Sequence, residues 1–120
     1  MNRYCVEQWE KNKENLRKAF ENSNVYSDYQ EFAQLVIENI FPDWKVHVVD
    51  VHYFGDCYYG DVIFFIHSRY DEHCYQSILS YGSCSVCDTL QRAADSGVAD
   101  LMTVALHFIQ NMREPFDVEN

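Results

Sequence analysis

Two cysteines, Cys84 and Cys87, form a Cys-x-x-Cys motif between a predicted strand and a predicted helix, and this spacing could support chemistry. Backbone N–H groups and the dipole at a helix N-terminus stabilise a thiolate, and cysteines at this spacing can also form a redox-active disulfide. The same motif supplies half of the ligand set of a tetrahedral zinc site. In the third interpretation, which the sequence favours, both cysteines are small apolar side chains packed in a structural turn.

The rest of the chain gives zinc and redox chemistry little support. A second Cys-x-x-Cys and a closely spaced histidine pair are both missing, so other residues would have to complete a zinc site. The candidates for that role are Cys57, Cys74, His67, His73 and His107. A redox motif usually follows the first strand of a βαβ unit, and the neighbouring Asp88 carboxylate would disfavour a thiolate. We therefore expect no cofactor, with zinc or a reactive thiol at Cys84 and Cys87 as the alternative.

No combination of residues predicts an enzyme. The sequence contains no Ser-His-Asp order, no glycine-rich phosphate loop and no His-Glu-x-x-His motif. Carboxylates gather in the two turns that flank a predicted central strand, at Asp56, Asp61, Asp71 and Glu72. Solvated turn residues explain this cluster better than a metal site does.

The hydrophobic pattern predicts four helices and three strands. The helices are expected at residues 4–22, from a cap at Ser27 to Pro42, after Gly82 with a cap at Ser83 or Ser85, and at 98–113. The strands are expected from Trp44 onward, at 61–68 and at 74–81. The apolar run from Val62 to Ile66 is typical of a central strand that is covered on both faces.

This order predicts a single α+β domain over residues 1–120, with a small three-stranded antiparallel sheet, two N-terminal helices and two C-terminal helices. No stretch approaches the roughly 20 apolar residues of a membrane span, and the first residues do not resemble a signal peptide. The five cysteines, an odd number, then indicate free thiols in a reducing cytoplasm.

The acidic charge lies in the body of the domain. The formal net charge is −10, and residues 24–120 hold fifteen of the nineteen carboxylates but only four of the nine lysines and arginines. Such a chain lacks the basic surface that nucleic-acid binding and docking on anionic lipid require. Solubility through charge repulsion is the simplest explanation of the acidity. The functional interpretation is a surface that attracts a basic protein partner.

Aromatic residues make up 16% of the chain, with nine tyrosines and eight phenylalanines, which is more than a small core usually buries. We therefore expect several exposed tyrosines, and tyrosine beside carboxylates is typical of protein interfaces. The candidate partner-binding residues lie in the turns beside the sheet, at Asp56, Tyr58, Tyr59, Asp61, Tyr70, Asp71 and Glu72.

The segment Ser80-Tyr81-Gly82-Ser83-Cys84-Ser85-Val86-Cys87-Asp88-Thr89-Leu90-Gln91, followed by Leu101-Met102-Thr103-Val104-Ala105-Leu106-His107, resembles a group of small acidic proteins encoded by phages and prophages of Firmicutes. In that group a strand ends in Ser-Tyr-Gly-Ser-Cys-Ser-Gly-Cys-Asp, and Val86 stands here in place of the second glycine. The resemblance covers most of the chain, although the helical N-terminus is similar only loosely. It implies a phage origin and an accessory role, and inhibitors of host defence such as anti-CRISPR proteins are a prominent class of such factors.

We therefore expect a non-enzymatic binding protein in the host cytoplasm. Its acidic, tyrosine-rich surface would occupy the basic groove of a host nucleic-acid-handling protein, without contacting nucleic acid or membrane itself. One alternative is a small zinc- or thiol-based module at Cys84 and Cys87. Another is a phage structural or regulatory adaptor that forms a homodimer through its sheet or its last helix.

Overall fold

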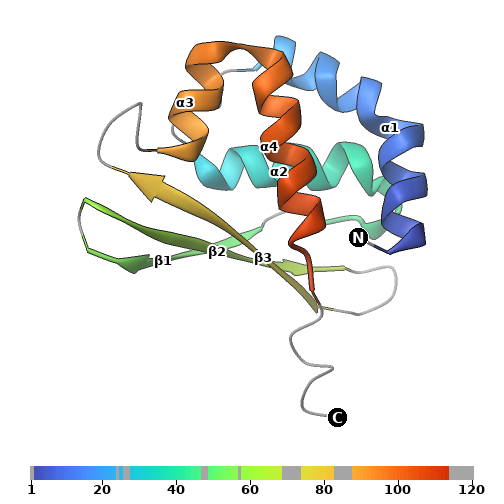
Figure 1. Cartoon of the computed structure of the whole chain (residues 1–120). Coiled ribbons are helices and arrows are strands. Elements are labelled where there is room, and N and C mark those ends of the chain that lie inside the picture. Colours follow the sequence, from blue (N-terminus) through green and yellow to red (C-terminus); the bar gives the residue numbers. More distant parts are fainter. Residues whose placement is uncertain are drawn as a thin grey trace.

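The computed structural model describes residues 2–23, 25, 28–46, 49–56, 58–68, 74–82 and 88–113. Two helices precede three strands, and two further helices follow them (Figure 1), which confirms the predicted α+β fold. The elements are α1 (Arg3–Glu21), α2 (Tyr29–Ile40), the 3-10 turn η1 (Pro42–Trp44), β1 (Asp50–Gly55), β2 (Tyr59–His67), β3 (Cys74–Gly82), α3 (Thr89–Ser96) and α4 (Val98–Gln110).

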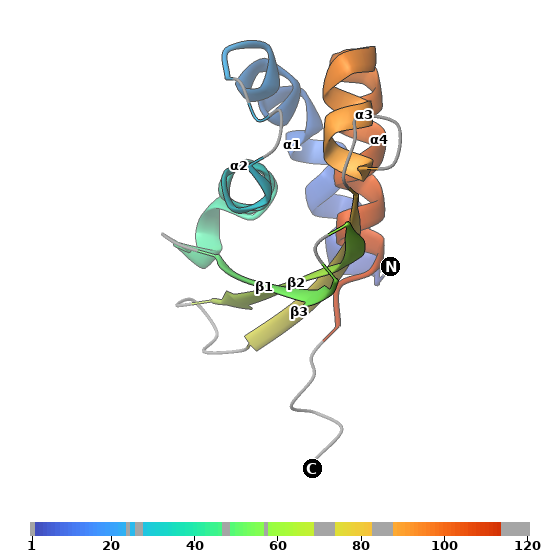
Figure 2. The same ribbon diagram turned by 90° about the vertical axis from the view of Figure 1, so that its left-hand side faces the viewer.

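The three strands form an antiparallel sheet in the order β1-β2-β3, so β2 is central and each strand pairs with its neighbour in sequence. All four helices lie on one side of this sheet (Figure 2). Side chains alternate between the two faces of a strand, so every second residue of the sheet faces away from the helices. We call this second side the outer face.

The central strand shows that the expectation of cover on both faces was wrong. Val62, Phe64 and Ile66 are fully buried against the helices, whereas the alternating residues Ile63 and Phe65 are only half-buried on the outer face. Neighbouring strands supply that partial cover. The imidazole of His52, for example, meets the Phe65 ring edge-on with centroids 5.3 Å apart. Here a continuous apolar run therefore marks a central strand that helices cover on one face only.

The first strand begins later than predicted because Trp44 belongs to a tight turn. Pro42 opens η1, and the Trp44 indole stacks between the rings of Phe41 and Tyr75, with centroid distances of 4.1 and 4.5 Å. Lys45 then adopts a left-handed conformation with φ of 55°. Burial of the indole fixes this turn, and extended pairing starts only at Asp50.

Both helix caps predicted at serine are occupied by aspartate. At the start of α2, the Asp28 carboxylate accepts a hydrogen bond from the Glu31 N–H at 2.9 Å, one residue beyond the predicted cap. At the start of α3, Asp88 accepts from the Leu90 and Gln91 N–H groups at 3.1 and 3.0 Å. An ionised carboxylate accepts several such bonds and also interacts favourably with the helix dipole. The predicted caps Ser27, Ser83 and Ser85 lie outside the described residues.

Candidate functional site

Exposed aromatic side chains gather at the end of the sheet where β1 turns into β2. The exposed fractions are 58% for Tyr53, 55% for Phe54, 65% for Tyr58 and 68% for Tyr59. Two exposed aspartates lie among them in the chain. We call this set the hairpin surface, and it consists of Tyr53, Phe54, Asp56, Tyr58, Tyr59 and Asp61.

Asp56 organises the turn at the tip of the hairpin. Its Oδ1 atom accepts hydrogen bonds from the Tyr58 N–H at 2.7 Å and from the Tyr59 N–H at 3.0 Å. The Asp56 N–H donates in turn to the Tyr59 carbonyl at 3.2 Å. The Tyr59 and Tyr58 N–H groups hold the pKa of the Asp56 carboxyl below its usual range, so this side chain is ionised at neutral pH.

Two glycines let the strands approach closely at the base of this turn. A Cβ added to Gly60 would lie 2.2 Å from the Phe54 carbonyl oxygen and 2.8 Å from the Gly55 Cα. Gly55 also has φ of 140°, a conformation that strongly favours glycine. The Tyr81 hydroxyl, from β3, donates to the Asp56 carbonyl at 2.5 Å. Backbone and side-chain contacts together therefore hold Asp56 and the two glycines in place.

Tyr53 joins the hairpin surface to the helix layer. Its ring meets those of Tyr81 and Tyr29 edge-on, with centroids 5.4 and 6.4 Å apart. Partial burial, followed by the nearby carboxylates Asp28 and Asp88, raises the pKa of the Tyr53 hydroxyl. This hydroxyl remains protonated at neutral pH and can donate a hydrogen bond to a partner.

The outer face continues the hairpin surface without any lysine or arginine from the strands. Phe54 pairs directly with Asp61 across β1 and β2, and Ile78 on β3 is also exposed. Between residues 46 and 68 the chain has three aspartates and no lysine or arginine, and residues 74–82 have no charged residue. The His67 Nε2 atom lies 3.8 Å from the Asp50 Oδ2 atom on this face. The surface therefore combines apolar area with negative charge.

The structure brings together four of the seven predicted partner-binding residues, namely Asp56, Tyr58, Tyr59 and Asp61. The other three, Tyr70, Asp71 and Glu72, lie outside the described residues. They belong to the connection between His67 and Cys74, which pair with each other at the far end of the β2–β3 ladder. The nine residues of β2 separate the two ends by about 26 Å at the usual rise of a strand.

Cys84 and Cys87 also lie outside the described residues, but both flanks of their segment are firmly held. Asp88 is only 4% exposed, and its Oδ2 accepts from the Gly82 N–H at 2.9 Å. Its Oδ1 accepts from the Tyr29 hydroxyl at 2.7 Å. The last described residue before the motif is thus bonded directly to the first one after it.

Within the described ranges, no three histidine, cysteine, aspartate or glutamate side chains form a group that could hold a metal ion. Two cysteines in these ranges, Cys5 and Cys74, are free thiols, and burial raises the pKa of both. His107, one of the candidates for completing a zinc site, is exposed on α4.

Tyr53 and Phe54 were missed by the sequence-based prediction. They precede the Gly55-Asp56 turn directly, and a pair of aromatic residues beside a turn in an edge strand would have been the pattern to use.

Comparison of the chain with protein-family models, curated proteins and solved structures found no match. In the described part of the chain, no helix has the length and apolar character needed to cross a membrane.

Proposed function

We propose that this protein is a non-enzymatic inhibitor that binds another protein through its hairpin surface. The partner would be a host nucleic-acid-handling protein, and the hairpin surface would occupy its basic groove in place of nucleic acid. The observation that supports this best is the gathering of four aromatic side chains, each more than half exposed, around two aspartates on a sheet whose strands contain no lysine or arginine.

The composition of the hairpin surface suits a binding hot spot. Tyrosine offers a large contact area with few rotatable bonds, and it is enriched among the residues that dominate binding energy. Scattered exposed apolar residues are normal on any protein, but several exposed aromatic residues gathered at one end of a sheet are typical of an interaction site.

The rigidity of the tip supports the same proposal. Asp56 binds the backbone on both sides of Tyr58, and Tyr81 holds the Asp56 carbonyl. Because these hydrogen bonds already restrain Asp56, Tyr58 and Tyr59, these residues have less conformational entropy to lose when a partner binds. Such preorganisation favours recognition over a passive solubilising role for these aspartates.

The resemblance of residues 80–91 to small phage and prophage proteins supports an anti-defence role, in the manner of anti-CRISPR proteins. Ser80, Gly82 and Asp88 of this segment take part in the hydrogen bonds that join β3, α2 and α3. The described ends of the shared motif therefore help to maintain the fold, so the partner-binding residues would be expected elsewhere, as on the hairpin surface.

Affinity capture from a nuclease-treated bacterial lysate tests this proposal. The wild-type protein should enrich a nucleic-acid-binding protein, and adding excess DNA or RNA should compete with that capture. A Tyr58→Ser/Tyr59→Ser double variant should lose the captured protein, whereas Asp43→Lys, a change on the remote turn η1, should retain it. Equal capture by both variants, or enrichment of no nucleic-acid-binding protein, would reject the proposal.

A further inference from the structure

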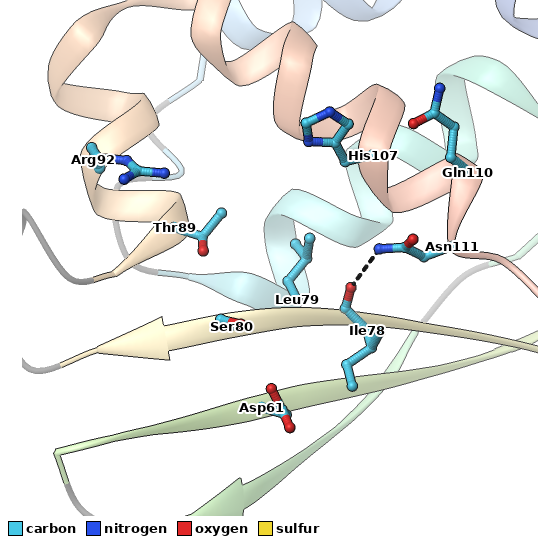
Figure 3. Close-up of a pocket in the computed structure, with 9 residues that line it drawn as sticks. All are labelled: Asp61, Ile78, Leu79, Ser80, Thr89, Arg92, His107, Gln110 and Asn111. Atoms are coloured by element: carbon cyan, nitrogen blue, oxygen red, sulfur yellow. Dashed lines mark hydrogen bonds between the residues drawn. The ribbon is translucent and has the colours of Figure 1, made fainter.

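A polar groove lies between the free edge of β3 and the helix pair α3–α4. It consists of two adjoining hollows of about 500 and 290 Å³, and Thr89, Arg92 and His107 line both. Figure 3 shows Arg92 and Thr89 projecting from α3, and His107 from α4, toward the space beside β3. Asp61 lies where this groove meets the hairpin surface.

The backbone of β3 presents hydrogen-bonding groups to this side. The Gln76 N–H donates to the Arg113 carbonyl at 2.6 Å, and the Gln76 carbonyl accepts from the Arg113 N–H at 2.8 Å, on the edge away from β2. In an antiparallel ladder, alternate residues of a strand direct their N–H and C=O groups to the same side. Ile78 and Ser80 therefore also present their backbone groups to this edge.

The Ile78 carbonyl at this edge is already in use, but two N–H donors are not. The Ile78 carbonyl accepts from the Asn111 amide at 3.2 Å, and the Ser80 carbonyl lies 2.9 Å from the Tyr29 hydroxyl. Across the described residues, no acceptor is found for the N–H groups of Ile78 and Ser80 at this edge. A strand edge with two free donors can bind a segment that contributes carbonyl oxygens.

The helix side of the groove adds further donors. Arg92 makes no ion pair with any residue in the described ranges, although the protein is strongly acidic. Its guanidinium, the His107 ring and the Thr89 hydroxyl line the same space as the β3 edge. The carboxylates Asp61 and Asp100 also line the two hollows, so the acceptor that a ligand brings must reach Arg92 itself, and a guanidinium pairs best with a carboxylate.

The spacing of the free donors selects the class of ligand. Two N–H groups two residues apart on a strand are about 7 Å apart, which exceeds the separation of the two oxygens of one carboxylate. Alternate carbonyls of an extended peptide have the same repeat. We propose that this groove binds an extended peptide segment, which adds to β3 beside Ile78 and Ser80 and directs an Asp or Glu side chain to Arg92.

This inference goes beyond the proposed function and does not depend on it, because the groove and the aromatic tip can be altered separately. The probe is acetyl-Thr-Val-Glu-Val-Thr-amide at millimolar concentration, with its Gln and Lys analogues at the central position. Binding is followed by the amide chemical shifts of the ¹⁵N-labelled full chain. The protein variants are Arg92→Ala and, as a charge-matched control on α1, Arg3→Ala.

The glutamate peptide should shift the Ile78 and Ser80 amide signals of the wild-type protein and of Arg3→Ala. The Gln analogue, or the Arg92→Ala variant, should weaken binding by about fivefold or more, and the Lys analogue should bind least. The proposal is overturned if these amide signals do not move with any peptide. It is equally overturned if they move to the same extent with the Lys analogue or in Arg92→Ala.

Discussion

The Tyr29 hydroxyl donates a hydrogen bond of 2.7 Å to the Asp88 carboxylate, which joins the first turn of α2 to the N-cap of α3. The same hydroxyl lies 2.9 Å from the Ser80 carbonyl and accepts from the Leu90 N–H at 3.3 Å. One side chain thus connects the two helix pairs with the end of β3. Through its bond to Asp88, Tyr29 holds the residue that directly follows the Cys-x-x-Cys motif, and this contact is a hydrogen bond between two side chains.

The variant Tyr29→Phe should lower the free energy of unfolding by about 1–3 kcal/mol, because the buried Asp88 carboxylate loses the hydroxyl that donates to it. Urea denaturation monitored by circular dichroism measures this change. Tyr58→Phe, which removes a hydroxyl from an exposed ring, is the matched control and should change stability little. Equal stability of the two variants would mean that the Tyr29 hydroxyl does not support the fold.

Alkaline pH should destabilise the wild-type protein more than Tyr29→Phe. Burial, followed by the hydrogen bond to Asp88, raises the pKa of Tyr29 in the folded state. The stabilisation linked to this raised pKa is complete below the unfolded value of about 10 and is lost as the pH rises above it. The difference in unfolding free energy between the wild-type protein and Tyr29→Phe should therefore be smaller at about pH 11 than at about pH 8. Parallel pH profiles would contradict the assignment.

The sequence predicted the element types and their order because each apolar pattern is local. Val36 and Ile37 on α2, and Ala105 and Phe108 on α4, are buried as their spacing indicated. Helix starts were harder, since Ser27 and Asp28 are both good caps by composition. Asp88 is the N-cap of α3, and its carboxylate is held there by hydrogen bonds from Gly82 and from Tyr29, which is 59 residues away. Such contacts between distant segments cannot be inferred from local pattern.

The candidate surface was predictable only in part. Asp56, Tyr58 and Tyr59 follow from a turn rich in glycine and aspartate, which must lie at the surface. Tyr53 and Phe54 lie within a strand, and the alternation of a strand does not reveal which end the helices leave uncovered. Phe54 is exposed because all helices lie on the other side of the sheet, whereas Tyr53, on the helix side, remains exposed in the edge strand β1 (Figure 2).

Gly60→Ala should destabilise the protein by about 1–3 kcal/mol, because the new Cβ meets backbone atoms of Phe54 and Gly55 that cannot move without breaking the strand pair. Thermal unfolding measures the effect. Ser80→Ala, at an exposed site of β3, is a control that adds no atoms to the sheet. A melting temperature equal to that of Ser80→Ala would show that the hairpin accommodates the methyl group.

We expect the purified protein to contain no stoichiometric zinc. Chelation, or the variant Cys84→Ser, should then change the free energy of unfolding by less than about 0.5 kcal/mol, because Asp88 already binds Gly82 across the motif. Elemental analysis and urea denaturation are the measurements, with Cys74→Ser as the control at a half-buried thiol. Stoichiometric zinc that disappears in Cys84→Ser would establish the zinc-module alternative instead.

Binding of the captured partner should weaken as salt rises, because ions screen the attraction between the acidic hairpin surface and a basic groove over about 10 Å at 0.1 M. At low salt, Asp61→Lys should reduce affinity by about tenfold, whereas the same reversal at Asp43 on η1 should reduce it far less, because that residue lies away from the hairpin surface. The salt dependence of Asp61→Lys should also be shallower than that of the wild type. Calorimetric titrations at two salt concentrations separate these effects. An affinity that is indifferent to both salt and charge reversal would exclude an electrostatic mechanism and leave the aromatic side chains alone to account for recognition.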